Sequence, residues 1–179
     1  DHGDMDGAHK LHAKGAVAYR EQNHVPLVIR HPDHPGGKRC QAVTSHVDIA
    51  PTLLALASVE PGDELPGRRL DELALAPAPV ERAVLVTSRL PELAGRGGAI
   101  TAFRRGTDKL IESGADAWFF DLAADPAETT NTRAVRPSEF ERLRREREAE
   151  AAREGERGDG RRPAAVPPDP AALESLGYF

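Results

Sequence analysis

Four short runs rich in β-branched, aliphatic and aromatic residues constrain the fold of this chain most. They cover residues 83–87, 99–104, 109–112 and 117–122. Runs of this length and composition predict β-strands, and the short spacings between the last three predict an antiparallel meander. We therefore expect a small antiparallel sheet with Trp118 and Phe120 in its core.

Helices are predicted before and after these strands. Residues 46–58 combine an N-cap candidate, Asp48, with Pro51 in the first turn and an apolar stripe. Residues 125–128, Asp-Pro-Ala-Glu, have the pattern of a second helix start. Residues 137–154 predict a charged helix that is solvated and stabilised by ion pairs four residues apart.

The remaining segments predict one further strand and several loops. Residues 25–30, Val-Pro-Leu-Val-Ile-Arg, predict a strand buried on both faces. Residues 60–79 are rich in proline and predict irregular structure with a boundary near 76–80. We expect residues 155–170 to be disordered and the C-terminal segment to dock back through apolar side chains. The expected division of the chain is 1–78, 79–135, 136–170 and 171–179.

Charge and composition exclude several classes of protein. The chain has 24 Lys and Arg against 29 Asp and Glu, a net charge of −5, which argues against nucleic-acid binding. No apolar run approaches the roughly 18 residues of a membrane span. Cys40 is the single cysteine, so an intrachain disulfide and a Cys-rich zinc site are excluded. The chain begins with Asp1 rather than Met, and we expect that the beginning of the protein is missing.

Residues 1–14 gather carboxylates, imidazoles and amines in one segment. Carboxylates suit calcium or magnesium, and imidazoles add affinity for borderline metals. The spacing of an EF-hand fails, because its first ligand would fall on His2 and its last on Ala13. His9 and His12 lack the glutamate of a zinc-protease helix. The spacing alone leaves a metal site and a polar surface loop as alternatives.

A family resemblance favours the metal site. Asp1-His2-Gly3, then Gly7, His9, Leu11, Lys14 and Tyr19, followed by residues 25–30, resembles the second half of the catalytic domain of sulfatases, in the alkaline-phosphatase-like superfamily. The same order continues in residues 45–54, in 120–131 and in Leu176-Gly177-Tyr178. The resemblance implies an α/β fold: the C-terminal part of an alkaline-phosphatase-like α/β catalytic domain over 1–78, then a small antiparallel-sheet subdomain with a helix.

The resemblance also implies residue roles. Asp1 would be a ligand of a divalent cation, expected to be calcium with magnesium as the alternative, and His2 a second ligand or a contact to the nucleophile. Lys14 would be a catalytic and substrate-binding residue that holds the sulfate group and offsets charge on the leaving oxygen. His9 is a further substrate-binding candidate without a firm role. The expected substrate is a small-molecule or sugar sulfate ester.

The nucleophile of the family is absent from these residues. It is a formylglycine formed in a Cys/Ser-x-Pro-x-Arg motif, and Cys40 is followed by Gln41-Ala42-Val43. We expect Cys40 to be a small, semi-buried residue, the formylglycine to belong to the missing N-terminal part, and the isolated chain to be inactive. A cation held only by Asp1 and His2 would bind weakly. The alternatives are a phosphonate or phosphate ester hydrolase of the same superfamily, a non-catalytic remnant or pseudoenzyme, and a His/Asp-rich metal-binding module.

Overall fold

The computed structural model of the chain describes residues 2–12, 17–32, 36–37, 39–60, 65–75, 81–88 and 100–158. Several predictions concern residues outside this part. These are the roles of Asp1 and Lys14, the boundary at 76–80, the docking of 171–179 and most of the expected disorder over 155–170, of which residues 155–158 belong to the last helix.

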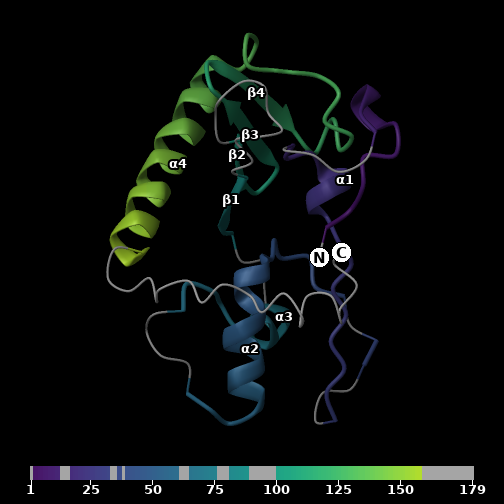
Figure 1. The fold of residues 1–179 in the computed structure, drawn as a ribbon, viewed down its shortest axis with the longest axis vertical. Coiled ribbons are helices and arrows are strands. Elements are labelled where there is room, and N and C mark those ends of the chain that lie inside the picture. Colours follow the sequence, from purple (N-terminus) through teal and green to yellow (C-terminus); the bar gives the residue numbers. More distant parts are fainter. Residues whose placement is uncertain are drawn as a thin grey trace, which may run out of the picture.

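The second half of the chain forms a four-stranded antiparallel sheet (Figure 1). Its strands are β1 (Ala83–Ser88), β2 (Ile100–Arg105), β3 (Asp108–Ser113) and β4 (Asp116–Asp121), in that order across the sheet. Leu110 is opposite Phe103 on one side and Phe119 on the other. The meander predicted from the spacing of the strands is therefore confirmed.

Helix α4 (Pro137–Gly158) covers one face of this sheet (Figure 1). Side chains alternate between the two faces of a strand, so every second residue points toward α4. The core between them consists of Phe103, Leu110, Phe119, Phe140 and Leu143. The rings of Phe119 and Phe140 meet edge to face with centroids 6.1 Å apart.

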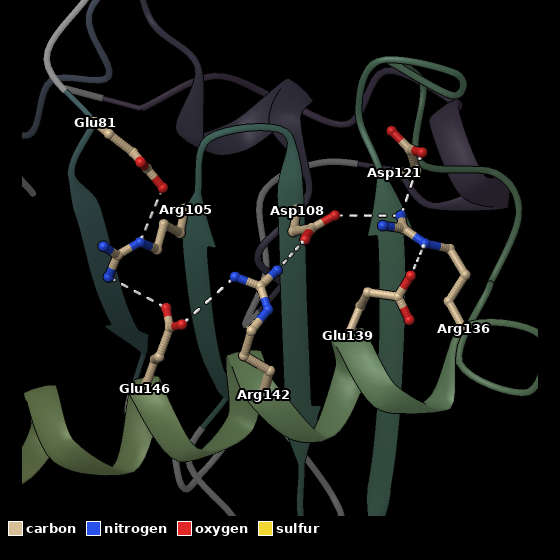
Figure 2. A network of polar contacts seen from close by, with 8 residues as sticks. All are labelled: Glu81, Arg105, Asp108, Asp121, Arg136, Glu139, Arg142 and Glu146. Atoms are coloured by element: carbon tan, nitrogen blue, oxygen red, sulfur yellow. Dashed lines mark hydrogen bonds and ion pairs between the residues drawn. The ribbon is translucent and has the colours of Figure 1, made fainter.

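Charged side chains border this core at one end of the strands (Figure 2). Arg142 of α4 contacts Asp108 of β3 at 2.8 Å, and Glu146 contacts Arg105 of β2 at 3.2 Å. The network alternates in sign through Glu81, Arg105, Glu146, Arg142, Asp108, Arg136 and Asp121. The predicted pairs within the helix exist, as in Arg142–Glu146 at 3.5 Å. The expectation of a solvated helix is wrong for this side of α4, because its charges bind the sheet.

The opposite face of the sheet has a second core. Ala102, Ile111 and Phe120 are buried there with Ala18, and Trp118 and Tyr19 pack against them. The predicted core positions of Trp118 and Phe120 are therefore confirmed. The short helix α1 (Arg20–Asn23) follows Tyr19 and lies on the side of the sheet away from α4 (Figure 1).

The helix predicted over residues 46–58 is present in two parts. A 3₁₀ helix, η2 (His46–Asp48), leads into α2 (Ile49–Leu56). Asp48 does not cap α2 with its side chain. Its carboxylate accepts a hydrogen bond from the Ser45 N–H at 2.8 Å and binds Arg82, which immediately precedes β1.

Two further predictions in the first half of the chain are wrong. Residues 25–30 form no strand, and the side chains of Leu27, Val28 and Ile29 are 45%, 89% and 50% exposed. A strand needs a hydrogen-bonded neighbour, and the described residues provide none beside this run. Helix α3 (Leu70–Leu75) lies within the stretch that was expected to be irregular. Leu70 and Leu73 of α3 are buried, and the Leu70 N–H donates to Thr52 Oγ1 of α2.

Candidate functional site

The loop that contains His2 and Gly3 is attached to α1 through the backbone. The Gly3 N–H donates to the Gln22 carbonyl at 2.9 Å. A Cβ atom on residue 3 would lie 1.9 Å from the Glu21 carbonyl oxygen, so only glycine fits at this position. His2 is exposed, and its Nδ1 lies 2.9 Å from the Gly3 carbonyl oxygen. The part of the predicted loop that the structure describes, His2 and Gly3, therefore lies against residues 21 and 22.

His9 is held by contacts with two residues that follow Lys14 in the sequence. It lies in the short 3₁₀ helix η1 (Ala8–Lys10) with a positive φ of 53°. Its ring stacks on Tyr19 with centroids 3.8 Å apart, and its Nε2 lies 3.6 Å from Glu21 Oε2. That carboxylate oxygen is buried and makes no hydrogen bond. The structure thus joins His9 to Tyr19 and Glu21, contacts that the sequence did not predict.

The hydroxyl of Tyr19 has a pKa above the ordinary tyrosine value. Burial raises the pKa of its hydroxyl, and the carboxylates of Glu128 and Glu21 raise it further. Its ring meets Phe120 edge to face at 6.3 Å. Tyr19 therefore links the segment of His9 to the core on this face of the sheet.

The described residues do not by themselves form a cation site. No group of three or more His, Cys, Asp or Glu side chains within them is placed to hold a metal ion. His2 is the one predicted ligand that they include, and Asp1 and Lys14 lie outside them. Divalent calcium or magnesium takes about six ligands, so the donor set seen here does not fit such an ion without further residues.

Cys40 lies at the surface beside the end of α3. It is exposed, so the prediction that it is semi-buried is wrong. Its Sγ lies 3.7 Å from the Leu73 carbonyl oxygen, and the Ala42 N–H approaches it at 3.4 Å.

A buried ion pair between Lys109 and Glu128 was not predicted from the sequence. Both Glu128 oxygens contact Lys109 Nζ, at 2.7 and 2.8 Å, and Glu128 is 3% exposed. Burial lowers the pKa of Lys109, and Glu128 opposes this shift. The alternation of β3 places Lys109 on the same face as the apolar Ile111, a signal that could have indicated an inward-facing charge.

The helix predicted to start at residues 125–128 is absent. The carboxylate of Asp125 accepts hydrogen bonds from the Thr130 N–H at 2.7 Å and the Thr129 hydroxyl at 3.1 Å, which closes a turn. Glu128 has a φ of 57°, in the left-handed region, which directs its side chain to Lys109. The local pattern was overridden because a tertiary ion pair holds this residue.

A cavity of about 390 Å³ lies beside this ion pair. It is bounded by the sheet face opposite α4, by α1 and by residues 40–44. Arg20, Arg104, Lys109 and Glu128 supply its charged lining. Neither His2 nor His9 lines it.

Comparison with known proteins agrees with this architecture. Residues 1–59 match the family model "Sulfatase". An uncharacterized sulfatase, YidJ, of Escherichia coli K12 is 47% identical over 72 residues, covering 39% of this chain and 14% of its own. An ulvan-active sulfatase of Formosa agariphila is 32% identical over 157 residues, covering 83% of this chain and 30% of its own. The chain therefore spans less than a third of each of these two relatives.

Solved structures show the same fold. A 2-O GAG sulfatase superposes with a TM-score of 0.69 at 21% identity, covering 95% of this chain and 38% of that one. The phosphonate monoester hydrolase of Agrobacterium radiobacter superposes with a TM-score of 0.65 at 26% identity, covering 86% and 34%.

The fold is thus of the α/β, alkaline-phosphatase-like type, with an antiparallel sheet and a covering helix in its C-terminal part. The chain belongs to the sulfatase family, as its first residues predicted. None of the helices in the described residues combines the length and the apolar character that crossing a membrane requires.

Proposed function

We propose that the residues of this chain serve a metal-dependent hydrolase of sulfate monoesters. The observation that carries the proposal is the match of residues 1–59 to the sulfatase family, in a chain whose His2 and Gly3 lie in a loop attached to α1. The contact between Gly3 and Gln22 supports it, because it attaches the loop to a folded element rather than leaving it as a polar surface segment.

Lys14 is the proposed catalytic residue. A sulfate ester carries a negative charge that repels an attacking nucleophile, and a lysine ammonium is a compact charge suited to offset it. The same charge would stabilise the leaving oxygen as it gains electron density. His9 remains a substrate-binding candidate, and its ring is already oriented by Tyr19 and Glu21.

A divalent cation, expected to be calcium with magnesium as the alternative, belongs to the proposal through Asp1 and His2. Asp1 and His2 would hold such an ion together with further ligands, and the ion would supply Lewis-acid polarisation of a sulfate oxygen. Dialysis against a chelator should abolish turnover, and readdition of calcium should restore it. Metal content measured by mass spectrometry should fall in His2→Ala and stay at the wild-type level in the control His12→Ala, since His12 is exposed.

The 179 residues contain no Cys/Ser-x-Pro-x-Arg motif. We therefore expect the isolated chain to be inactive toward 4-nitrophenyl sulfate. Turnover by this chain alone would contradict the formylglycine part of the proposal. The pseudoenzyme alternative predicts, in addition, that no form of the protein is active.

The decisive assay uses the whole reading frame that encodes these residues, expressed with a formylglycine-generating enzyme. Hydrolysis of 4-nitrophenyl sulfate is expected, and Lys14→Ala should lower kcat by about 10²- to 10³-fold, the cost of removing one group that stabilises transition-state charge. Lys10→Ala is the matched control, because Lys10 is an exposed lysine four residues away. Equal activity of the two variants would remove Lys14 from the mechanism.

A second candidate is hydrolysis of phosphonate or phosphate esters. It is favoured by the similarity to the phosphonate monoester hydrolase of Agrobacterium radiobacter. The same preparation tested with phenyl phosphonate and 4-nitrophenyl phosphate separates the two, and a larger kcat/KM for phosphorus than for sulfur esters would favour this candidate.

A further inference from the structure

The cavity beside the Lys109–Glu128 pair has an excess of positive charge. Three cationic side chains, Arg20, Arg104 and Lys109, line it together with one carboxylate. Both oxygens of that carboxylate, Glu128, are bound to Lys109. Among the described residues, neither Arg20 nor Arg104 has a carboxylate within ion-pair distance, so no described side chain forms a direct ion pair with either arginine.

The two guanidinium groups keep free donors. Arg104 donates through Nε to the Gly106 carbonyl at 3.1 Å, and Arg20 donates through Nη1 to the Pro126 carbonyl at 2.9 Å. These bonds fix both side chains and occupy one donor of each. A guanidinium has five N–H donors arranged as a fork, so each arginine can still bind an anion.

Burial and mutual repulsion add to this argument. Arg104 is partly buried, and burial lowers the pKa of its guanidinium while Glu128 raises it and the Arg20 charge lowers it again. Two like charges held near each other in a partly desolvated cavity repel, and an anion between them relieves that cost. The carboxylate of Glu21, like that of Glu128, raises the pKa of Lys109, but Glu21 does not line the cavity.

We propose that this cavity binds a sulfate or carboxylate group of an anionic sugar, between Arg20 and Arg104. The cavity volume of about 390 Å³ is in the range of small-molecule sites and exceeds what a bare ion needs. Apolar side chains such as Val84, Val86 and Ala102 form its floor and provide a surface for a sugar ring. The identity of the ligand as a sugar rests on the proposed function, whereas the binding of an anion does not.

The test measures binding directly in the whole protein by titration calorimetry. The probes are N-acetylglucosamine 6-sulfate, glucuronic acid and inorganic sulfate. The dissociation constant for the sugar sulfate should rise about tenfold or more in Arg104→Gln, because one charged hydrogen-bonding partner is lost. Arg153→Gln is the matched control, since Arg153 lies exposed on α4, pairs with Glu150 and does not line the cavity.

A second measurement does not depend on a variant that folds. Addition of the sugar sulfate to isotope-labelled wild-type protein should shift the amide resonances of residues 20–24, 40–44 and 102–109. Equal binding of the sugar sulfate by Arg104→Gln and wild type, or shifts confined to other residues, would overturn the proposal. Inorganic sulfate that binds as tightly as the sugar sulfate would overturn the assignment of the ligand as a sugar.

The outcome is separable from that of the proposed function. Turnover of 4-nitrophenyl sulfate reports on the catalytic residues and is measured in the same preparations as binding. Sugar binding that depends on Arg104 in a protein without turnover would contradict the hydrolase and support the cavity. Turnover without Arg104-dependent binding would contradict the cavity alone.

Discussion

The guanidinium of Arg82 binds both carboxylate oxygens of Asp48, at 2.6 and 3.1 Å. The carboxylate also accepts the backbone N–H of Ser45 and that of Arg68, each at 2.8 Å. Asp48 is completely buried and Arg82 nearly so. One side chain therefore connects the start of α2, the chain that enters α3, and the chain that enters β1.

Loss of this pair should destabilise the protein strongly. In Arg82→Ala the buried carboxylate of Asp48 loses its charged partner, which costs about 3 kcal/mol or more. Urea denaturation measures the free energy of unfolding. Arg145→Ala is the control, because Arg145 is exposed on α4, and we expect a change of less than about 0.5 kcal/mol there. Equal changes in the two variants would contradict the structural role of the pair.

Glycine at position 3 should be irreplaceable. Gly3→Ala places a methyl group 1.9 Å from the Glu21 carbonyl oxygen, so the loop must move away from α1. We expect a lower melting temperature and, in the whole protein, loss of the proposed sulfatase activity. Gly36→Ala serves as the control, because an added Cβ at Gly36 meets nothing within 4 Å. A Gly3→Ala variant with the melting temperature and activity of the wild type would show that the contact with residue 21 is dispensable.

The pKa of the buried Lys109 amine should lie below the ordinary lysine pKa of 10.5, because burial lowers it. Between its native pKa and 10.5 the unfolded chain holds a proton that the native protein lacks, so this residue makes stability rise with pH across that interval. Glu128→Gln removes the charge that opposes the effect of burial, so the native pKa of Lys109 should fall further. NMR titration of the lysine side chain measures both values.

The control for this titration is Glu141→Gln, a change of an exposed glutamate on α4. It should leave the pKa of Lys109 as in wild type. A higher pKa of Lys109 in Glu128→Gln would contradict the assigned role of the ion pair.

Phe140 should anchor α4 to the sheet. Its side chain is 2% exposed and packs on Phe119, so Phe140→Ala leaves a cavity and should cost about 3–5 kcal/mol. Val135→Ala is the control. Val135 is 78% exposed, so its removal should change the free energy of unfolding by less than about 0.5 kcal/mol. Comparable losses in the two variants would mean that α4 is not held through this ring.

The strands were predictable because each is a short run of β-branched, aliphatic and aromatic residues, with short spacings between the last three. The three hairpin-linked runs therefore gave the correct meander, and Phe120 the correct core position. The partner of Asp48 lies 34 residues away and that of Glu128 lies 19 residues away. Local spacing does not show such partners, so it indicated an N-cap at Asp48 and a helix start that included Glu128.

At the candidate site, too, contacts between separate segments could not be predicted from local sequence. The resemblance placed His2 and Gly3 in a loop, but the contact that requires glycine comes from the backbone of Glu21. The stacking of His9 on Tyr19 depends on the path of the chain between them. The strand predicted at residues 25–30 followed from apolar composition alone, whereas a strand forms only where another strand can pair with it.

The order of charges between α4 and the sheet has a consequence for how the helix can move. Arg142 faces Asp108, and one turn further along α4 Glu146 faces Arg105. A slide of the helix by one turn in one direction would set Glu146 against Asp108, and in the other direction Arg142 against Arg105. In either shifted position two like charges would face each other and repel. A one-turn shift of the helix along the sheet is thereby disfavoured, and its alignment is encoded in the sequence of signs as well as in the apolar contacts.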